Sequence, residues 1–305
     1  MELIYADKNT SIEMKEDVVA TIGMFDGVHL GHDKVLKELK REGSISKMPT
    51  VIITFKEELD FVLDKRKTGS LMTFEDKIKI LSEYDLDYCL VFPFTKEFSL
   101  IKYYDFENIL KEKVKVKKIV IGKDTKYGYM GEGNIKTLSK IFEVKVIDDY
   151  ILDGICIHSS LIRNLLSLGE VEKANTYLGR NFSISGIVTK GSQLGQTFNV
   201  KTANIELNNN YEYLKNGVYG CFIYIDKKKY LGICNIGHNP TFNYVEKKRL
   251  EVNIFDFNSD IYETDIKVEF ILFVREERKF SSENELYSQI NSDIKKVKEK
   301  IILWK

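Results

Sequence analysis

The sequence has few cysteines, no long apolar run and no excess of charge of one sign. Its four cysteines, Cys89, Cys156, Cys221 and Cys234, lie far apart, and none belongs to a Cys-x-x-Cys pair. This usage excludes a disulfide-rich secreted class and predicts a reducing, cytoplasmic setting. No apolar run approaches the about 18 residues of a membrane-crossing helix, and no signal segment opens the chain, so we expect no membrane partner and no export.

Charge and length set two further limits. The 46 basic residues balance 46 acidic ones, so no global field would recruit nucleic acid or a membrane surface. At 305 residues the chain is long for a single core. A break in composition near residue 181 predicts two domains, 1–180 and 181–305. Nothing in the sequence indicates an oligomeric state.

Residues 17–180 alternate short apolar runs with longer amphipathic ones. The predicted strands are Val18–Ile22, Val51–Phe55, Tyr88–Phe92, Ile119–Ile121 and Val144–Ile147, and the predicted helices cover 31–42, 73–83, 104–112, 134–142, 159–168 and 170–177. This alternation predicts a Rossmann-like α/β domain, a parallel sheet with helices on its faces. Ligands of such folds gather at the carboxyl ends of the strands.

From residue 182 the helical period disappears, and short apolar or alternating runs follow one another. They are Phe182–Thr189, Val218–Ile225, Tyr230–Asn235, Leu250–Phe257 and Ile266–Val274. The pattern predicts a small antiparallel β-barrel. The stretch Ser282–Trp304 then places Leu286, Ile290, Ile294, Val297 and Ile301 on one face behind a Ser282/Glu285 cap, which predicts a terminal helix on the barrel. The expected fold class is therefore α/β plus β.

Residues 21–32 read Thr-Ile-Gly-Met-Phe-Asp-Gly-Val-His-Leu-Gly-His, a glycine-rich turn between a buried strand and a helix. Such a helix start presents N–H groups and the positive end of its dipole to an anion. His29 and His32 add imidazole donors, which suits the phosphate chain of ATP. No P-loop or dinucleotide fingerprint is present. Taken alone, a His-x-x-His pair here would more often be an ordinary polar helix start.

The whole string resembles the G-x-F-D-x-x-H-x-G-H signature of nucleotidyltransferases, specifically the adenylyltransferase half of the bacterial bifunctional riboflavin kinase/FAD synthetase family. Two later segments also resemble this family: Ile121-Gly122-Lys123-Asp124-Thr125-Lys126-Tyr127-Gly128, and His158-Ser159-Ser160-Leu161-Ile162-Arg163, which is similar to its I-S-S-T-x-I-R motif. Without the resemblance, the serines would be simple helix caps. The resemblance implies ATP contacts from Gly23, Phe25, Gly31, Asp124, Ser159 and Ser160, and catalytic roles for His29, His32 and Arg163.

The segment from Gly186 to Asn204 looks like the riboflavin kinase signature G-x-x-x-G-R-x-x-G-F-P-T-A-N. Gln196, Asn199 and Lys201 replace its arginine, third glycine and proline. The resemblance implies that Gly191, Gly195, Thr202 and Asn204 contact ATP, that Thr202 and Asn204 hold Mg²⁺, and that Glu251 is the base that deprotonates riboflavin. Without it, Glu251 would be a solvent-facing carboxylate on a strand.

The resemblance implies a bifunctional enzyme that phosphorylates riboflavin to FMN and adenylylates FMN to FAD, with ATP as co-substrate and Mg²⁺ as cofactor. Two departures keep alternatives open. Lys56-Glu57-Glu58-Leu59 stands where the family has a Pro-His-Pro segment, and Thr125 stands where it has an aromatic residue. The alternatives are a chain with kinase activity only, a flavin-binding regulator without turnover, and an adenylyltransferase for another phosphorylated acceptor.

Overall fold

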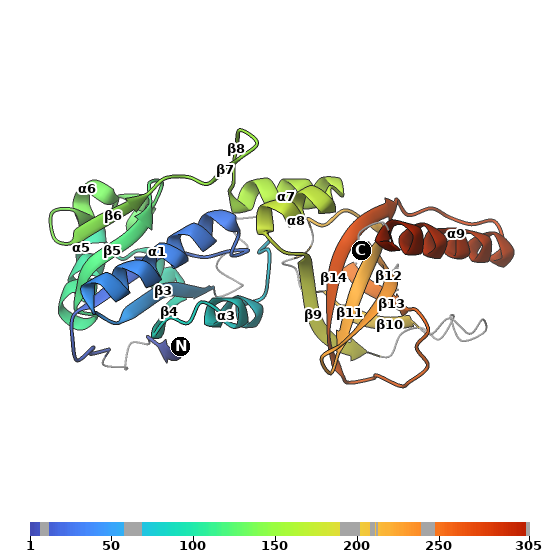
Figure 1. The fold of residues 1–305 in the computed structure, drawn as a ribbon, viewed down its shortest axis with the longest axis horizontal. Coiled ribbons are helices and arrows are strands. Elements are labelled where there is room, and N and C mark those ends of the chain that lie inside the picture. Colours follow the sequence, from blue (N-terminus) through green and yellow to red (C-terminus); the bar gives the residue numbers. More distant parts are fainter. Residues whose placement is uncertain are drawn as a thin grey trace. The chain divides into compact units, whose positions relative to one another are not determined.

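The computed structural model describes residues 1–6, 12–57, 69–189, 202–207, 211, 213–238 and 248–302. Contacts within the chain divide it into two compact units. The first unit contains Met1–Lys67 and Phe74–His158, and the second contains Thr68–Thr73 and Ser159–Lys305. Figure 1 shows an open sheet in the first unit and a barrel in the second.

The first unit is built on a six-stranded parallel sheet with the order β1-β4-β3-β2-β5-β6. Its strands are β1 Glu2–Tyr5, β2 Val18–Ile22, β3 Thr50–Glu57, β4 Tyr88–Phe94, β5 Val116–Gly122 and β6 Glu143–Ile147. The five predicted strands are confirmed. β1 is not among them, because its four partly exposed residues are too few to show a period.

The centre of this sheet positions the predicted nucleotide turn. β2 lies between β3 and β5, and all five of its residues are buried. A strand that is covered on both faces has a continuous apolar sequence. This is why the sequence pattern predicts β2 correctly. Because β2, β3 and β5 run parallel, the segments that follow them meet at one edge of the sheet.

The helices of the first unit include one long helix, α1 (Leu30–Ser46), which lies across a face of the sheet (Figure 1). The shorter elements are α3 Phe74–Ser82, α4 Lys96–Ser99, α5 Tyr103–Asn108 with the π-helical turn Ile109–Lys113, the 3₁₀ turn Tyr129–Gly131, α6 Ile135–Leu138, and the hairpin of β7 Ile151–Leu152 and β8 Ile155–Cys156. The predicted helix over 134–142 is wrong in length, because the backbone tightens into three-residue turns after Leu138. Leu138 and Phe142 are both buried, and their spacing of four imitates one continuous helix.

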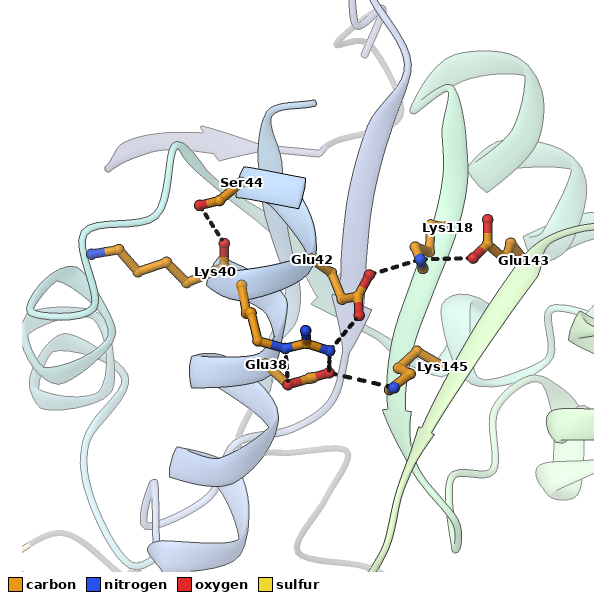
Figure 2. A network of polar contacts seen from close by, with 8 residues as sticks. Glu38, Lys40, Glu42, Ser44, Lys118, Glu143 and Lys145 are labelled. Carbon is orange, nitrogen blue, oxygen red and sulfur yellow. Dashed lines mark hydrogen bonds and ion pairs between the residues drawn. The ribbon is translucent and has the colours of Figure 1, made fainter. Parts of the chain in front are cut away.

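An ion-pair network holds the C-terminal part of α1 against the sheet (Figure 2). The buried Glu42 accepts from Arg41 Nη2 at 2.8 Å and pairs with Lys118 Nζ of β5 at 2.7 Å. Lys118 also pairs with Glu143 of β6 at 2.7 Å. Hydrogen bonds to Glu143 and Glu42 raise the pKa of the Lys118 ammonium. The network ties α1, β5 and β6 together away from the N-terminus of the helix.

The second unit is built on a closed antiparallel barrel with the order β10-β13-β12-β11-β14-β9. The strands are β9 Phe182–Thr189, β10 Thr202–Glu206, β11 Gly217–Ile225, β12 Lys228–His238, β13 Lys248–Ile254 and β14 Asp265–Arg275. The predicted barrel is confirmed. β10 is not among the predicted strands, because polar residues of the kinase signature interrupt its apolar pattern.

Helices flank the barrel in the chain: α7 (Ser159–Leu168) and α8 (Val171–Leu178) precede it, and α9 (Glu283–Ile302) follows it. α9 packs on apolar residues of the barrel through Ile290, Ile294, Val297 and Ile301. Leu286, predicted on the same face, is 38% exposed. Ser282 Oγ accepts from Glu285 N as predicted, but the Glu285 carboxylate accepts from Ser281 instead of Ser282. The terminal helix is confirmed with its Ser282 cap, and only the reciprocal bond to the Glu285 carboxylate shifts by one residue.

Candidate active sites

The turn from β2 to α1 contains three residues with positive φ, Phe25 (50°), Gly27 (78°) and Val28 (33°). Glycine adopts such values freely, whereas a β-branched residue rarely does. The side chains of Phe25 and Val28 are buried, each with 2% exposed, and this burial holds the turn in its strained form. Strain of this kind concentrates at ligand sites.

His29 is the N-cap of α1 and is 5% exposed. Its Nδ1 accepts hydrogen bonds from the backbone N–H groups of Gly31, at 3.1 Å, and His32, at 3.4 Å. An accepting Nδ1 carries no proton, so the proton of the neutral ring is on Nε2, which is a donor. The His32 ring stacks on His29 with centroids 3.8 Å apart, and Phe25 meets His32 edge-on at 5.2 Å. The turn therefore holds the two imidazoles as an oriented pair.

Gly31 leaves the space that this pair occupies. A Cβ at residue 31 would lie 3.0 Å from His29 Nδ1 and Cε1, closer than ordinary contact. Likewise, a Cβ at Gly23 would lie 3.2 Å from the Phe25 ring. The amides of Gly31 and His32 are bonded to His29 Nδ1, so these two N–H groups are not directed at an anion. For these two amides, the expectation that backbone donors face the anion is wrong.

Lys77 of α3, which sequence reasoning missed, contacts the turn that carries the predicted site. Its side chain is buried, and its Nζ donates to the carbonyl oxygen of Met24 at 3.1 Å and to that of Phe55 at 2.8 Å. Thr54 Oγ1 donates to the same Met24 oxygen at 3.4 Å. The ammonium group thus joins the strained turn after β2 to the end of β3. An amphipathic helix pattern gives no signal for such a lysine, because lysine is most often at the surface.

Asp124 lies in the turn that follows β5, the strand next to β2. Its side chain is exposed, whereas Thr125 Oγ1 turns back and donates to Gly122 O at 2.7 Å. Lys123 pairs with Asp149 at 2.7 Å, and this hydrogen bond lowers the pKa of the Asp149 carboxyl. Asp124 therefore lies at the same sheet edge as the histidine turn, and its carboxylate is accessible.

Ser159, Ser160 and Arg163 occupy the first turns of α7, in the second unit. Ser160 is exposed, and the other two are half-buried. The last residues of the first unit pass the start of α1: the carbonyl oxygen of Ile157 lies 3.6 Å from where a Cβ of residue 31 would be. His158 then leads directly into α7.

Part of the predicted kinase site lies outside the described residues. These are Gly191, Gly195 and the substituted positions Gln196, Asn199 and Lys201, together with the side chain of Thr202, whose backbone begins β10. The rest of the predicted site is described, and it lies on adjacent strands of the barrel.

Three polar residues form a row across neighbouring strands. Asn204 of β10 is opposite Glu251 of β13, which is opposite Asn235 of β12. Directly opposed residues share one face of a sheet. Their neighbours along β13, Leu250 and Val252, are fully buried, so side chains alternate between the barrel interior and the face that carries the row. The row therefore lies on the outer face of the barrel.

Glu251 is half-buried in this row. Burial raises the pKa of its carboxyl group; nearby Arg249 opposes this effect and Glu277 adds to it. A carboxylate with a raised pKa binds a proton more strongly than an ordinary glutamate, as a general base requires. Asn235 Nδ2 donates to Glu277 Oε1 at 2.9 Å, so a second carboxylate lies beside the row.

The donor chemistry of the row fits a hard cation. Among the described residues, no group of three or more His, Cys, Asp or Glu side chains could hold a metal ion. The expected set is different, since it consists of the Asn204 amide oxygen and the Thr202 hydroxyl, with the Glu251 carboxylate opposite Asn204. Oxygen donors of this kind, completed by phosphate oxygens, suit Mg²⁺.

Together, the sheet with its histidine turn and the barrel with its polar row define a transferase with two nucleotide-using units. Residues 11–161 match the family model of FAD synthetase, and residues 178–301 match that of riboflavin kinase. The chain belongs to the bifunctional riboflavin kinase/FMN adenylyltransferase family.

Similar proteins cover the chain almost completely. A bifunctional riboflavin kinase/FMN adenylyltransferase of Buchnera aphidicola is 39% identical over 98% of both chains. The protein of the same description from Bacillus subtilis is 35% identical over 90% of both. A crystal structure described as a macrolide-efflux protein from Streptococcus pneumoniae has a TM-score of 0.86 and 26% identity, over 98% of this chain and 99% of that one. No helix in the described ranges of this chain is long and apolar enough to cross a membrane.

Proposed function

We propose that this chain makes FAD from riboflavin in two steps. Residues 181–305 phosphorylate riboflavin to FMN, and residues 1–180 transfer an adenylyl group from ATP to FMN. The observation that carries the proposal is that FAD synthetase and riboflavin kinase matches follow one another along one chain. The four cysteines are free thiols, which supports a reducing compartment, the cytoplasm.

In the adenylyl transfer, a phosphate oxygen of FMN attacks the α-phosphorus of ATP, and the bond to pyrophosphate breaks. This reaction needs two repelling anions to be aligned and the charge on the leaving oxygens to be stabilised. His29 and His32 donate from the oriented imidazole pair, and Arg163 adds a permanent charge. Gly23, Phe25 and Gly31 shape the turn, while Asp124, Ser159 and Ser160 contact the nucleotide.

In the phosphorylation, the 5′-hydroxyl of riboflavin attacks the γ-phosphorus of ATP, and ADP leaves. Glu251 takes the hydroxyl proton, for which its raised pKa is suited. Thr202 and Asn204 would hold Mg²⁺, whose charge would offset the negative charge of the ATP phosphates. Gly191 and Gly195 contact the same ATP. Asn204 and Glu251 are directly opposite each other on adjacent strands, which supports a base beside the proposed metal ligand.

The test is chromatography of flavins after incubation with ATP and Mg²⁺, once from riboflavin and once from FMN. FAD should accumulate in both. If riboflavin stopped at FMN and supplied FMN remained unchanged, only the kinase would be active, and the departures at Lys56–Leu59 and Thr125 would explain it. Tight binding of flavin with no product would identify a regulator. Adenylylation of a different phosphorylated acceptor would identify the remaining alternative.

A further inference from the structure

The row on the outer face of the barrel extends beyond the base, on the side away from the ATP ligands. Asn204 lies on one side of Glu251, and Asn235 lies on the other. In phosphoryl transfer the attacking and leaving oxygens are roughly in line with the phosphorus. If ATP is held at Asn204, the alcohol that loses its proton to Glu251 approaches from the side of Asn235.

The second carboxylate on that side belongs to Glu277, and Gly237 leaves room for it. A Cβ at Gly237 of β12 would lie 2.1 Å from Glu277 Oε1, so a larger residue at position 237 would move the carboxylate away from this place. Glu277 Oε1 accepts the Asn235 Nδ2 hydrogen bond at 2.9 Å. This bond fixes the amide orientation of Asn235, since only its nitrogen can donate to a carboxylate.

The two residues before Glu277 hold this segment in place through ion pairs. Arg275 pairs with Asp293 at 2.8 Å, and Glu276 pairs with Lys215 at 2.9 Å. Glu277 itself is exposed. A carboxylate has about four lone-pair sites, so after accepting from Asn235 it can still accept from the hydroxyl groups of a ligand.

We propose that Asn235 and Glu277 form the acceptor side of the kinase site and bind the hydroxyl groups of the ribityl chain of riboflavin. This inference rests on the proposed riboflavin kinase activity. A polyol presents several O–H donors, and a carboxylate with an oriented amide offers the matching acceptors. The pair therefore selects a flavin that carries a hydroxylated side chain and positions its terminal hydroxyl at Glu251.

The test is steady-state kinetics of riboflavin phosphorylation by Glu277→Gln and Asn235→Ala, with lumiflavin, which lacks the ribityl chain, as a competitive inhibitor. The KM for riboflavin should rise by about tenfold or more, while the KM for ATP and the inhibition constant of lumiflavin stay at wild-type values. Glu299→Gln is the control, because it removes the same charge from an exposed side chain of α9 and should leave the KM for riboflavin unchanged. Gly237→Ala, which displaces the Glu277 carboxylate, should reproduce the effect of Glu277→Gln.

An unchanged KM for riboflavin in both variants would overturn the inference. So would a matching rise in the KM for ATP or weaker inhibition by lumiflavin, because either would mean that the pair supports the whole site. Failure of the proposed function is distinguishable: in that case the wild-type chain itself would form no FMN. Adenylyl transfer to supplied FMN, measured on the same preparations, should stay constant and shows that the variants are intact.

Discussion

At the scale of single residues, the histidine turn depends on contacts that a motif does not reveal. The signature identifies the turn and both histidines, and the structure explains its glycine through the ring of His29. Lys77 supports the same turn, but it is 53 residues away in the sequence from Met24, whose carbonyl oxygen it binds. No local pattern can identify such a partner, because the fold alone brings α3 to the turn.

Lys77→Met should therefore reduce adenylyl transfer. Without the ammonium, the Met24 and Phe55 carbonyls lose a donor, and the imidazole pair loses its support. A misplacement of about 1 Å can cost about 100-fold in rate, so we expect kcat/KM for FAD formation from FMN to fall by about 10- to 100-fold. The measurement is steady-state formation of pyrophosphate.

Lys79→Met is the matched control for this variant. Lys79 is on the same helix, its side chain is 67% exposed, and its ammonium group pairs with Asp76 at 3.7 Å. The control should keep wild-type FAD formation, and both variants should keep riboflavin phosphorylation. Equal activity of the two variants would show that Lys77 does not support the turn.

At the scale of elements, the sequence predicts strands that are buried on both faces, but it does not predict short or partly exposed elements. β2 and β9 are found at their predicted bounds, because their apolar content reflects continuous or alternating burial. β1 and β10 lack a sufficient pattern. The helix predicted at 134–142 fails for the opposite reason, since buried residues four apart are joined by turns. Sequence periodicity reports which residues are buried, and the backbone can satisfy that burial in more than one way.

Two kinds of contact hold α9 on the barrel. The sequence period predicts its apolar face, but it does not predict its ion pair with Arg275. Asp293 is fully buried and accepts from Arg275 Nε at 2.8 Å and from Gln289 Nε2 at 2.7 Å. Removing one partner of a buried pair leaves an uncompensated charge, at a cost of about 3 kcal/mol. Asp293→Ala should therefore lower the urea midpoint of kinase inactivation by about 1 M or more.

Lys295→Ala serves as the control on the same helix. Lys295 is 77% exposed and faces Glu299 at 3.9 Å, and exposed pairs of this kind contribute about 0.5 kcal/mol or less. Its urea midpoint should stay close to that of the wild type. If Asp293→Ala had the same small effect, the apolar contacts alone would hold α9 on the barrel.

At the scale of the whole molecule, the sequence predicts two folds in order. The structure groups Thr68–Thr73 with the chain from Ser159 onward, so the two helices that precede the barrel belong to its unit. The adenylyltransferase residues Ser159, Ser160 and Arg163 thus belong to a helix grouped with the barrel. A composition break cannot find this division, because α7 and α8 have the helical pattern of the first unit while their contacts are made with the second.

The two activities should nevertheless be separable by single substitutions. Glu251→Gln removes the kinase base, so it should stop FMN formation but still make FAD from supplied FMN. His29→Ala removes the N-cap and one imidazole, so it should convert riboflavin to FMN and stop there. Because each reaction binds its own substrate from solution, an equimolar mixture of the two variants should make FAD from riboflavin when neither does so alone. Chromatography of the flavins follows all three incubations. A mixture that accumulates FMN without FAD would mean that FMN passes only within one chain, and loss of both activities in either folded variant would contradict two separate catalytic centres.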